Sequence, residues 1–386
     1  MKKFLVALCA LLLIVFAAAE WILPSQIEAS MNMTRAHAPY DISDEARQLH
    51  ESLFVADLHA DSLLWKRDLT KRSDIGHVDL PRLNEGNVAL QVFDSVTKTP
   101  TDLNYQRNTA DSDDITKLAI ASLWPVRTWS SLYERAVYQG GKLQALAAKS
   151  ELELITNKKQ MRNFVSRRAT GEKLVAAIFA IEGAHPLQGD IGRLDALFEH
   201  GLRVSGLTHF FDNELGGSLH GVSGQGLTQF GGQVVRRADE LEIIIDIAHA
   251  SPQMVKDVLD ITTRPVILSH GGVKGACDSP RNLDDDLMKR IAANGGLVGI
   301  GFWKGAVCDA SPGGVVNSIR YAIDLLGAEH VALGSDYDGA VTTNFDSSEL
   351  AVLTHEMLAN GFTEQEIRHV MGENVKRFFL ENLPEG

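Results

Sequence analysis

Short apolar runs rich in Val, Ile, Leu and Phe recur along the chain from about residue 50 onward. The runs are continuous instead of alternating strictly between apolar and polar residues, which is typical of parallel strands covered on both faces. We expect eight of them to be strands: Leu53–Asp57, Val88–Asp94, Val175–Glu182, Val204–His209, Ile243–His249, Pro265–His270, Leu297–Phe302 and Val331–Asp336.

Amphipathic segments with recognisable helix ends separate most of these runs. Ser251 followed by Pro252 is typical of an N-cap and a first helical position. Thr363 and Glu366 have the spacing of a capping box before the last helix. Eight strands that alternate with helices predict an α/β fold, a (β/α)8 barrel of the TIM type.

The interval between the second and third predicted strands is unusually long. Within it, residues 111–148 have a helical pattern and carry Trp124, Trp129 and Tyr133. We expect a helical insertion of about residues 97–172 over the barrel mouth. Residues 50–386 would then form one barrel domain that includes this insertion.

The N-terminus has the pattern of an export signal. Lys2 and Lys3 precede the uncharged, mostly apolar run Phe4–Ala19, which ends in three small residues. Trp21–Leu23 could lengthen the run into an uncleaved anchor, and both readings stay open, with cleavage favoured. We therefore expect residues 1–23 to be a signal peptide or membrane anchor and residues 24–49 a loose connector. The protein would be extracytoplasmic: periplasmic, secreted, or held at the membrane by residues 4–23.

The charge and the cysteine content limit which partners and which disulfides can be expected. The formal net charge is −13, and no run of Lys and Arg could follow a phosphate backbone, so nucleic acid is not an expected partner. Cys9 lies in the leader, which leaves Cys277 and Cys308. Export permits a bond between them, but two cysteines make no disulfide framework, and unpaired thiols are the favoured expectation.

Most of the predicted strands end in side chains that can bind metals. These ends are the C-terminal ends, which meet at the face where barrel enzymes build their sites. The candidate side chains are His59 and Asp61 after the first strand, Glu182 after the third, His209, His249 and His270 after the next three, and Asp336 after the eighth.

Imidazole and carboxylate donors without cysteine suit zinc or a similar divalent ion. His59, Asp61, Glu182, His249 and His270 are too many ligands for one catalytic zinc, which normally keeps an open position for water. Two zinc ions that share a bridging carboxylate would use all five. Single histidines are more often structural, and that reading is kept for His77, His185, His200, His220, His330 and His355.

Around these residues the chain resembles the membrane dipeptidase (renal dipeptidase) family of zinc peptidases, which are amidohydrolase-like barrels. The similarity spans roughly residues 50–380, and its motifs are specific in order and spacing. They are Ala56–Asp61, Ile181–Gly183, Leu207–His209, Ile245–Ser251, Ile267–His270, Asp278–Leu283, Gly334–Gly339 and Gly372–Asn374.

The resemblance implies a role for each candidate residue. One zinc would be held by His59, Asp61 and Glu182, and the other by Glu182, His249 and His270, so that Glu182 is the bridge. His209 and Arg281 would contact the substrate, and Asp336 would occupy the proton-transfer position.

Elementary chemistry is consistent with these roles. Asp336 could pass a proton from water to the leaving amine, and His209 could stabilise the developing oxyanion. The planar fork of Arg281 suits the free carboxylate of a dipeptide, although a surface salt bridge with Asp284 or Asp285 is an alternative. Asp338 is expected to be structural.

Two segments depart from the family pattern. The residues after His209, Phe210–Gly217, and the long insertion differ from other members as judged by the resemblance. Both are expected to border the substrate pocket, so the substrate preference does not carry over.

Three functions remain open from the sequence. The leading hypothesis is a zinc-dependent dipeptidase that hydrolyses the amide bond of short peptides by attack of a metal-bridging hydroxide. The second is hydrolysis of another amide, a lactam or a lactone on the same scaffold. The third is a non-catalytic metal- or peptide-binding protein. A homodimer is a further expectation, since such barrels often dimerise.

Overall fold

The computed structural model describes residues 23–150 and 152–386. The leader predicted for residues 1–23 therefore lies, apart from Leu23, outside the described residues. Within the described ranges, no helix has the length and apolar character needed to cross a bilayer.

Parallel strands form a closed barrel, as the sequence predicted. The strands pair side by side in chain order, and the pairing of β3 with β5 from Leu90↔Ala176 to Val96↔Glu182 closes the ring. The barrel strands are β2 (Val55–Ala60), β3 (Val88–Val96), β5 (Val175–Glu182), β6 (Leu202–Gly206), β7 (Ile244–Asp246), β8 (Ile267–Leu268), β9 (Leu297–Ile300) and β10 (Val331–Leu333).

Several strands end earlier than predicted, and β7 and β8 are shortened most. The expected runs Ile243–His249 and Pro265–His270 leave the ladder at Asp246 and Leu268. Here a side chain takes the place of backbone hydrogen bonds between strands. Asp246 Oδ1 accepts from the backbone N–H groups of Ala248 and Ser269, each at 2.9 Å. The chain is thus free to turn His249 and His270 into the barrel mouth.

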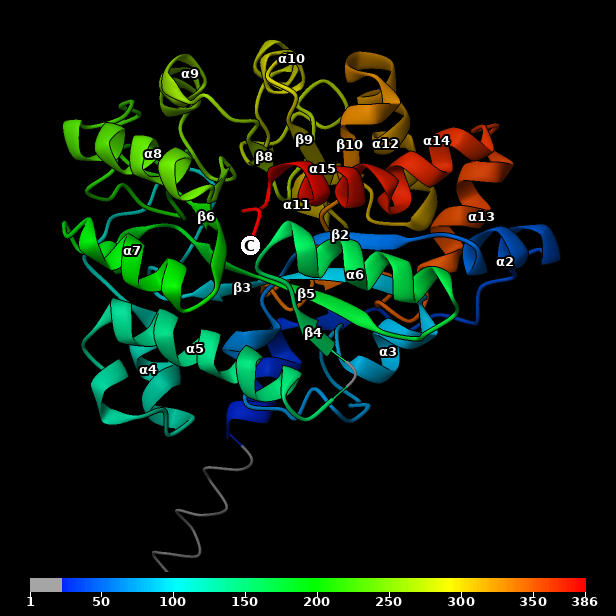
Figure 1. Ribbon diagram of the computed structural model, residues 1–386, viewed down its shortest axis with the longest axis horizontal. Helices are drawn as coiled ribbons and strands as arrows, with labels where there is room; N and C mark the ends of the chain where they lie inside the picture. The colour runs from blue at the N-terminus through cyan, green and yellow to red at the C-terminus, as the bar shows by residue number, and fades with distance from the viewer. Residues whose placement is uncertain (1–22, 151) are drawn as a thin grey trace, which may run out of the picture.

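Helices surround the strands, and several of them begin at a residue whose side chain caps the helix. Ser251 accepts from Met254 N at the start of α9, and the Thr363–Glu366 capping box of α14 is present. Figure 1 shows these helices arranged around the strands. They are α3 (Leu80–Glu85), α7 (Gly192–Glu199), α8 (Gln229–Leu241), α9 (Pro252–Ile261), α10 (Asp285–Ala293), α11 (Lys304–Val307), α12 (Pro312–Leu326), α13 (Ala351–Ala359), α14 (Glu364–Arg368) and α15 (Asn374–Asn382).

The inner face of the barrel follows the two-residue period of its strands. Ala176, Ile178 and Ala180 of β5 belong to one buried core cluster, together with residues of the other strands. Because alternate side chains of a strand point to the same face, Glu182 at the end of β5 continues this inward row. The strand pattern therefore places Glu182 at the barrel mouth.

The insertion between β3 and β5 packs against both ends of the barrel. It contains α4 (Asp114–Ala121), α5 (Leu132–Ala147), β4 (Leu152–Leu154) and α6 (Lys158–Ala169). Met161 and Phe164 of α6 pack with Phe378 and Phe379 of α15 under the barrel core, and both helices lie in front of the strands in Figure 1. Only the first part of the insertion borders the mouth, so the expectation of an insertion wholly over the mouth was too broad.

The segment expected to be a loose connector is structured. Residues 23–31 are helical, β1 (Met33–Thr34) pairs with β11 (Thr342–Thr343), and α2 (Asp44–Glu51) follows. Glu28 is 1% exposed and forms an ion pair with Arg67. The local sequence did not reveal this because the partners are distant in the chain.

Cys277 and Cys308 form a disulfide, contrary to the expectation of unpaired thiols. The two residues are separated by 31 positions, but the fold brings their Cα atoms to 5.6 Å, within bonding range. They lie on the loops that follow the neighbouring strands β8 and β9. Spacing alone could not show this proximity.

The buried residue His50 is expected to make the folded protein less stable at acidic pH. His50 lies between Thr354 Oγ1, at 2.8 Å from Nδ1, and the Gly86 carbonyl, at 3.0 Å from Nε2. Burial lowers the pKa of His50 below its usual 6.5. The neutral ring therefore contributes stability that is present above that value and is lost as the pH falls below it.

We expect the melting temperature to fall less between about pH 7.5 and about pH 5.5 in His50→Gln than in the unmodified protein. Thermal unfolding at both pH values measures the difference. His200→Gln, at an exposed position, is the control and should behave like the unmodified protein. An identical pH response of all three proteins would contradict the prediction.

Candidate active site

Every predicted site residue lies at the C-terminal end of the barrel. The side chains come from segments far apart in the sequence, and each residue is between 0% and 8% exposed. The group comprises His59, Asp61, Glu182, His209, His249, His270, Arg281 and Asp336.

One group of donors lies around the end of β2. His59 Nε2 lies 3.5 Å from Asp61 Oδ1 and 3.7 Å from Glu182 Oε1. Donor atoms of these three residues all lie within 4.8 Å of one another. The spacing suits the coordination of a single ion by the three side chains.

A second group shares the same glutamate oxygen. Glu182 Oε1 is 3.1 Å from His249 Nε2 and 3.4 Å from His270 Nε2, and the two nitrogens are 3.0 Å apart. Burial lowers the pKa of His249 and of His270 well below the usual range, so both rings are neutral and offer lone pairs. Glu182 lies between the two groups.

The donor set fits cations. Among the described residues, His59 Nε2 and Asp61 Oδ1 are buried without a hydrogen-bond partner. Burial, together with the nearby Asp61 charge, raises the pKa of Glu182 well above its usual range. Since several buried carboxylates repel one another, divalent ions would stabilise the ionised site.

Further side chains lie against the imidazole rings, and none of these was expected from the sequence. Asp94 Oδ2 lies 3.1 Å from His59 Nδ1. Ser269 Oγ lies 2.8 Å from His270 Nδ1 and donates to Asp246 Oδ2 at 2.6 Å. Such partners fix the orientation of metal-binding histidines. Asp94 ends the second predicted strand, so the signal that selected the other strand-end residues was present there too.

Two site residues have left-handed backbone. His249 and Asp336 both have φ 61°, a region that costs a residue with a Cβ roughly 1–2 kcal/mol. A Cβ at Gly339 would meet Asp336 Oδ1 at 2.1 Å, so the chain needs glycine beside this carboxylate. Strained backbone of this kind is typical of functional sites.

Asp336 and His209 flank the donor groups. Asp336 Oδ1 is 3.8 Å from His59 Nε2, and burial raises the pKa of Asp336 to about 8. His209 Nε2 is 3.2 Å from Glu182 Oε2. Both side chains face the cavity described below.

Arg281 is buried at the site, and the alternative of a surface salt bridge is wrong. Its Nη2 donates to the His270 carbonyl at 3.1 Å and lies 3.4 Å from His249 Nε2. Its guanidinium lies 5.5 Å from the centre of the Trp303 ring. Asp284 instead caps α10, and Asp285 accepts from Tyr321 and Gly275.

Asp338 lies outside the donor groups and is bound by neighbouring side chains and backbone. Asp338 accepts from Ser62 Oγ and from His77 N, and it pairs with Arg67. Burial would raise the pKa of Asp338, but the Arg67 guanidinium holds it below the usual range. The contacts of Asp338 match its expected structural role. Of the other histidines, His220 lies beside the site, with its ring 5.3 Å from that of His249.

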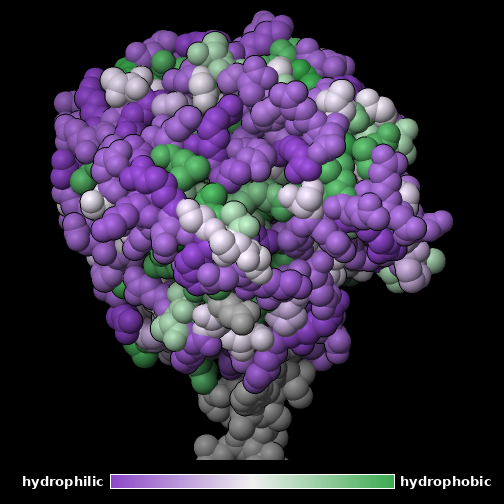
Figure 2. Space-filling model, turned by 45° about the vertical axis from the view of Figure 1, so that its right-hand side comes forward, coloured by the Kyte–Doolittle hydropathy of each residue, from purple (hydrophilic) through white to green (hydrophobic). Residues whose placement is uncertain are grey.

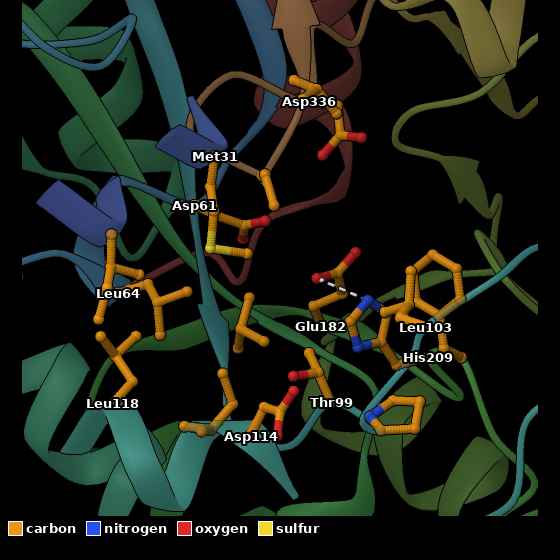
Figure 3. Close-up of a pocket in the computed structure, with 18 of the residues that line it drawn as sticks. Met31, Asp61, Leu64, Thr99, Leu103, Asp114, Leu118, Glu182, His209 and Asp336 are labelled. Atoms are coloured by element: carbon orange, nitrogen blue, oxygen red, sulfur yellow. Dashed lines mark ion pairs between the residues drawn. The ribbon is translucent and has the colours of Figure 1, made fainter. Parts of the chain in front are cut away.

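A cavity of about 680 Å³ opens in front of these side chains. Figure 3 shows Asp61, Glu182, His209 and Asp336 around it, on different segments of the chain. The insertion and the N-terminal helical segment complete its wall. Figure 2 shows a mostly hydrophilic face on which hydrophobic side chains gather in a central hollow.

The fold and the site together define a metal-dependent hydrolase barrel. A model of the membrane dipeptidase family, peptidase family M19, matches residues 43–382. The chain belongs to this family, and the resemblance found in the sequence is confirmed.

Three known proteins illustrate the relationship. Dipeptidase 3 of Mus musculus is 26% identical over 371 residues, which are 88% of this chain and 66% of that protein. Dipeptidase verJ of Clonostachys rogersoniana is 28% identical over 314 residues, 78% of this chain and 75% of that protein. The crystal structure of dipeptidase AC, a metallopeptidase, has a TM-score of 0.69 and 25% identity, and the match covers 86% of this chain and 99% of that chain.

Proposed function

We propose that this chain is a two-zinc dipeptidase that hydrolyses the peptide bond of short peptides. One observation carries the proposal. A single oxygen, Glu182 Oε1, lies within 3.7 Å of imidazole nitrogens of His59, His249 and His270. A carboxylate in that position is suited to bridge two ions, and membership of the membrane dipeptidase family supports the substrate class.

Each of the two donor groups described above would bind one zinc ion, and Glu182 belongs to both groups. His59, Asp61 and Glu182 would hold one zinc, and Glu182, His249 and His270 the other. Imidazole and carboxylate without thiolate is a donor set that catalytic zinc accepts. When bound, the two ions would supply Lewis acidity and lower the pKa of a water held at the site.

The surrounding residues would move the proton and position the substrate. Asp336 would take a proton from the attacking water and deliver it to the leaving amine nitrogen. His209 would donate to the oxygen on which negative charge develops. Arg281 would bind the free carboxylate of the dipeptide through its planar pair of N–H donors.

Metal removal tests the proposal directly. We expect the purified protein to hold about two zinc ions per chain and to cleave dipeptides. A chelator should abolish the cleavage and added zinc should restore it, as measured by metal mass spectrometry and amine release on the same sample. Two zinc ions without dipeptide cleavage would instead favour another amide, a lactam or a lactone. A folded protein with neither zinc nor cleavage would refute the proposal.

Arg281 offers a separate test of substrate binding. We expect Arg281→Lys to raise KM for dipeptides by about tenfold or more, because the point charge of lysine cannot reproduce the two-pronged contact. Zinc content should stay unchanged. A dipeptide amide, which lacks the carboxylate, should respond little to the substitution. An unchanged KM for the free dipeptide would remove Arg281 from the binding site.

We also propose an extracytoplasmic location. The sequence pattern of residues 1–23 and the Cys277–Cys308 disulfide support it, because disulfides form and persist in oxidising compartments. Whether residues 4–23 also anchor the protein is decided by comparing membrane and soluble fractions.

A further inference from the structure

The cavity has an apolar wall built from three segments of the chain. The helical segment of residues 23–31 contributes Ile27 and Met31, which are four residues apart and therefore share one helix face. Leu64 and Trp65, just after Asp61, and Ile115 and Leu118 of α4 complete the wall. Met31 remains 42% exposed toward the cavity, whereas Leu64, Trp65, Ile115 and Leu118 pack in one buried cluster that Ile27 contacts.

The wall is held firmly, although the sequence suggested a loose connector there. Glu28, on the same helical segment, is buried and paired with Arg67. Asn32 Oδ1 accepts from Ala340 N at 2.8 Å. The pairing of β1 with β11 fixes the chain directly after it. These contacts fix the position of the apolar wall relative to the rest of the site.

The apolar wall and Arg281 lie on different sides of the metal-binding residues. Leu64 and Trp65 follow Asp61 directly, whereas Arg281 contacts His249 and His270. In Figure 3, Met31, Leu64 and Leu118 lie on the Asp61 side of the pocket. A dipeptide whose carboxylate binds Arg281 would therefore direct its amino-terminal residue toward the apolar wall.

The cavity is large for a dipeptide of small residues. Its volume of about 680 Å³ falls in the range of pockets that enclose drug-sized ligands, roughly 300–1,000 Å³. A small dipeptide would leave water against the apolar wall, whereas a large apolar group would displace that water.

We propose that this wall makes the enzyme selective for dipeptides whose amino-terminal residue carries a large apolar side chain. The inference rests on the proposed dipeptidase function. The wall residues act on specificity through contact with that side chain, whereas the bond cleaved and the residues that cleave it stay the same.

The test compares kcat/KM for Phe-Ala, Ala-Phe and Gly-Ala with the zinc-loaded, full-length protein. We expect Phe-Ala to exceed both others by about tenfold or more. Met31→Gln keeps the side-chain length but adds a polar end, and it should reduce the ratio of Phe-Ala to Gly-Ala by about threefold or more. Ala121→Trp, which fills the cavity from the end of α4, should reduce the same ratio further. Ile120→Gln is the matched control, since Ile120 is an exposed apolar residue of α4 that does not line the cavity, and it should leave the ratio unchanged.

The possible results separate the two proposals. Equal rates on all three dipeptides, or a preference for Ala-Phe, would overturn the inference while the dipeptidase function stands. A preference for Phe-Ala that Met31→Gln and Ala121→Trp leave intact would also overturn it, because the wall would then not be its source. If the zinc-loaded protein cleaves none of the three, the dipeptidase proposal fails, and the inference that rests on it fails as well.

Discussion

Glu182→Gln is expected to abolish the two-metal site, with zinc falling from about two ions to less than one per chain and kcat/KM falling by at least about 10³-fold. Glutamine keeps the size of the side chain but removes the negative charge from Oε1. That atom lies within reach of nitrogens of His59, His249 and His270. Without a shared anionic donor, neither group of ligands would hold its ion firmly.

Zinc content by mass spectrometry and dipeptide turnover at fixed zinc check this prediction. The metal-free variant should melt no lower than the metal-free unmodified protein, because the substitution removes one of several buried carboxylates that repel one another. Glu381→Gln, on the exposed surface, is the control and should keep both zinc ions. A Glu182→Gln protein with two zinc ions and full turnover would refute the bridging role.

Asp336→Asn is expected to keep both zinc ions but to lower kcat by about 10²–10⁴-fold, with a much smaller change in KM. An amide can occupy the same space but cannot accept a proton from water. In the unmodified enzyme, activity requires ionised Asp336 and should rise with pH through the pKa of that group. The variant should lose this rising limb of its pH–rate profile.

Two measurements separate proton transfer from metal binding at Asp336. The donor atoms of Asp336, His59 and His270 also lie within 4.8 Å of one another. A loss of zinc in Asp336→Asn would therefore make Asp336 a ligand and contradict its assignment as the proton carrier. Retained zinc with an unchanged pH–rate profile would contradict it equally.

The barrel and the positions of the candidate site residues were predictable because their signals are local. A strand such as Val175–Glu182 shows in the sequence as a continuous apolar run, and its donor side chain stands directly at its end. The geometry of a parallel barrel then brings such ends to one face. Long-range structure was not needed to place Glu182, His249 or His270 on the same rim.

The features that the sequence analysis missed depend on partners far away in the chain. The helix at residues 23–31 is held by Arg67 and Ala340. The lengths of β7 and β8 depend on hydrogen bonds that the Asp246 carboxylate accepts from Ala248 N and Ser269 N, beyond the two strand ends. A local pattern contains no information about such contacts, so the connector and the strand ends were predicted incorrectly.

The disulfide joins the two segments that border Arg281, the residue proposed to bind the substrate carboxylate. Cys277 precedes Arg281 on one loop, and Cys308 follows Trp303, whose ring lies under the Arg281 guanidinium, on the other. In a reducing compartment this link would be open, and the loops would lose their covalent connection. Under the proposed function, the two loops would then hold the substrate carboxylate less firmly than in an oxidising compartment.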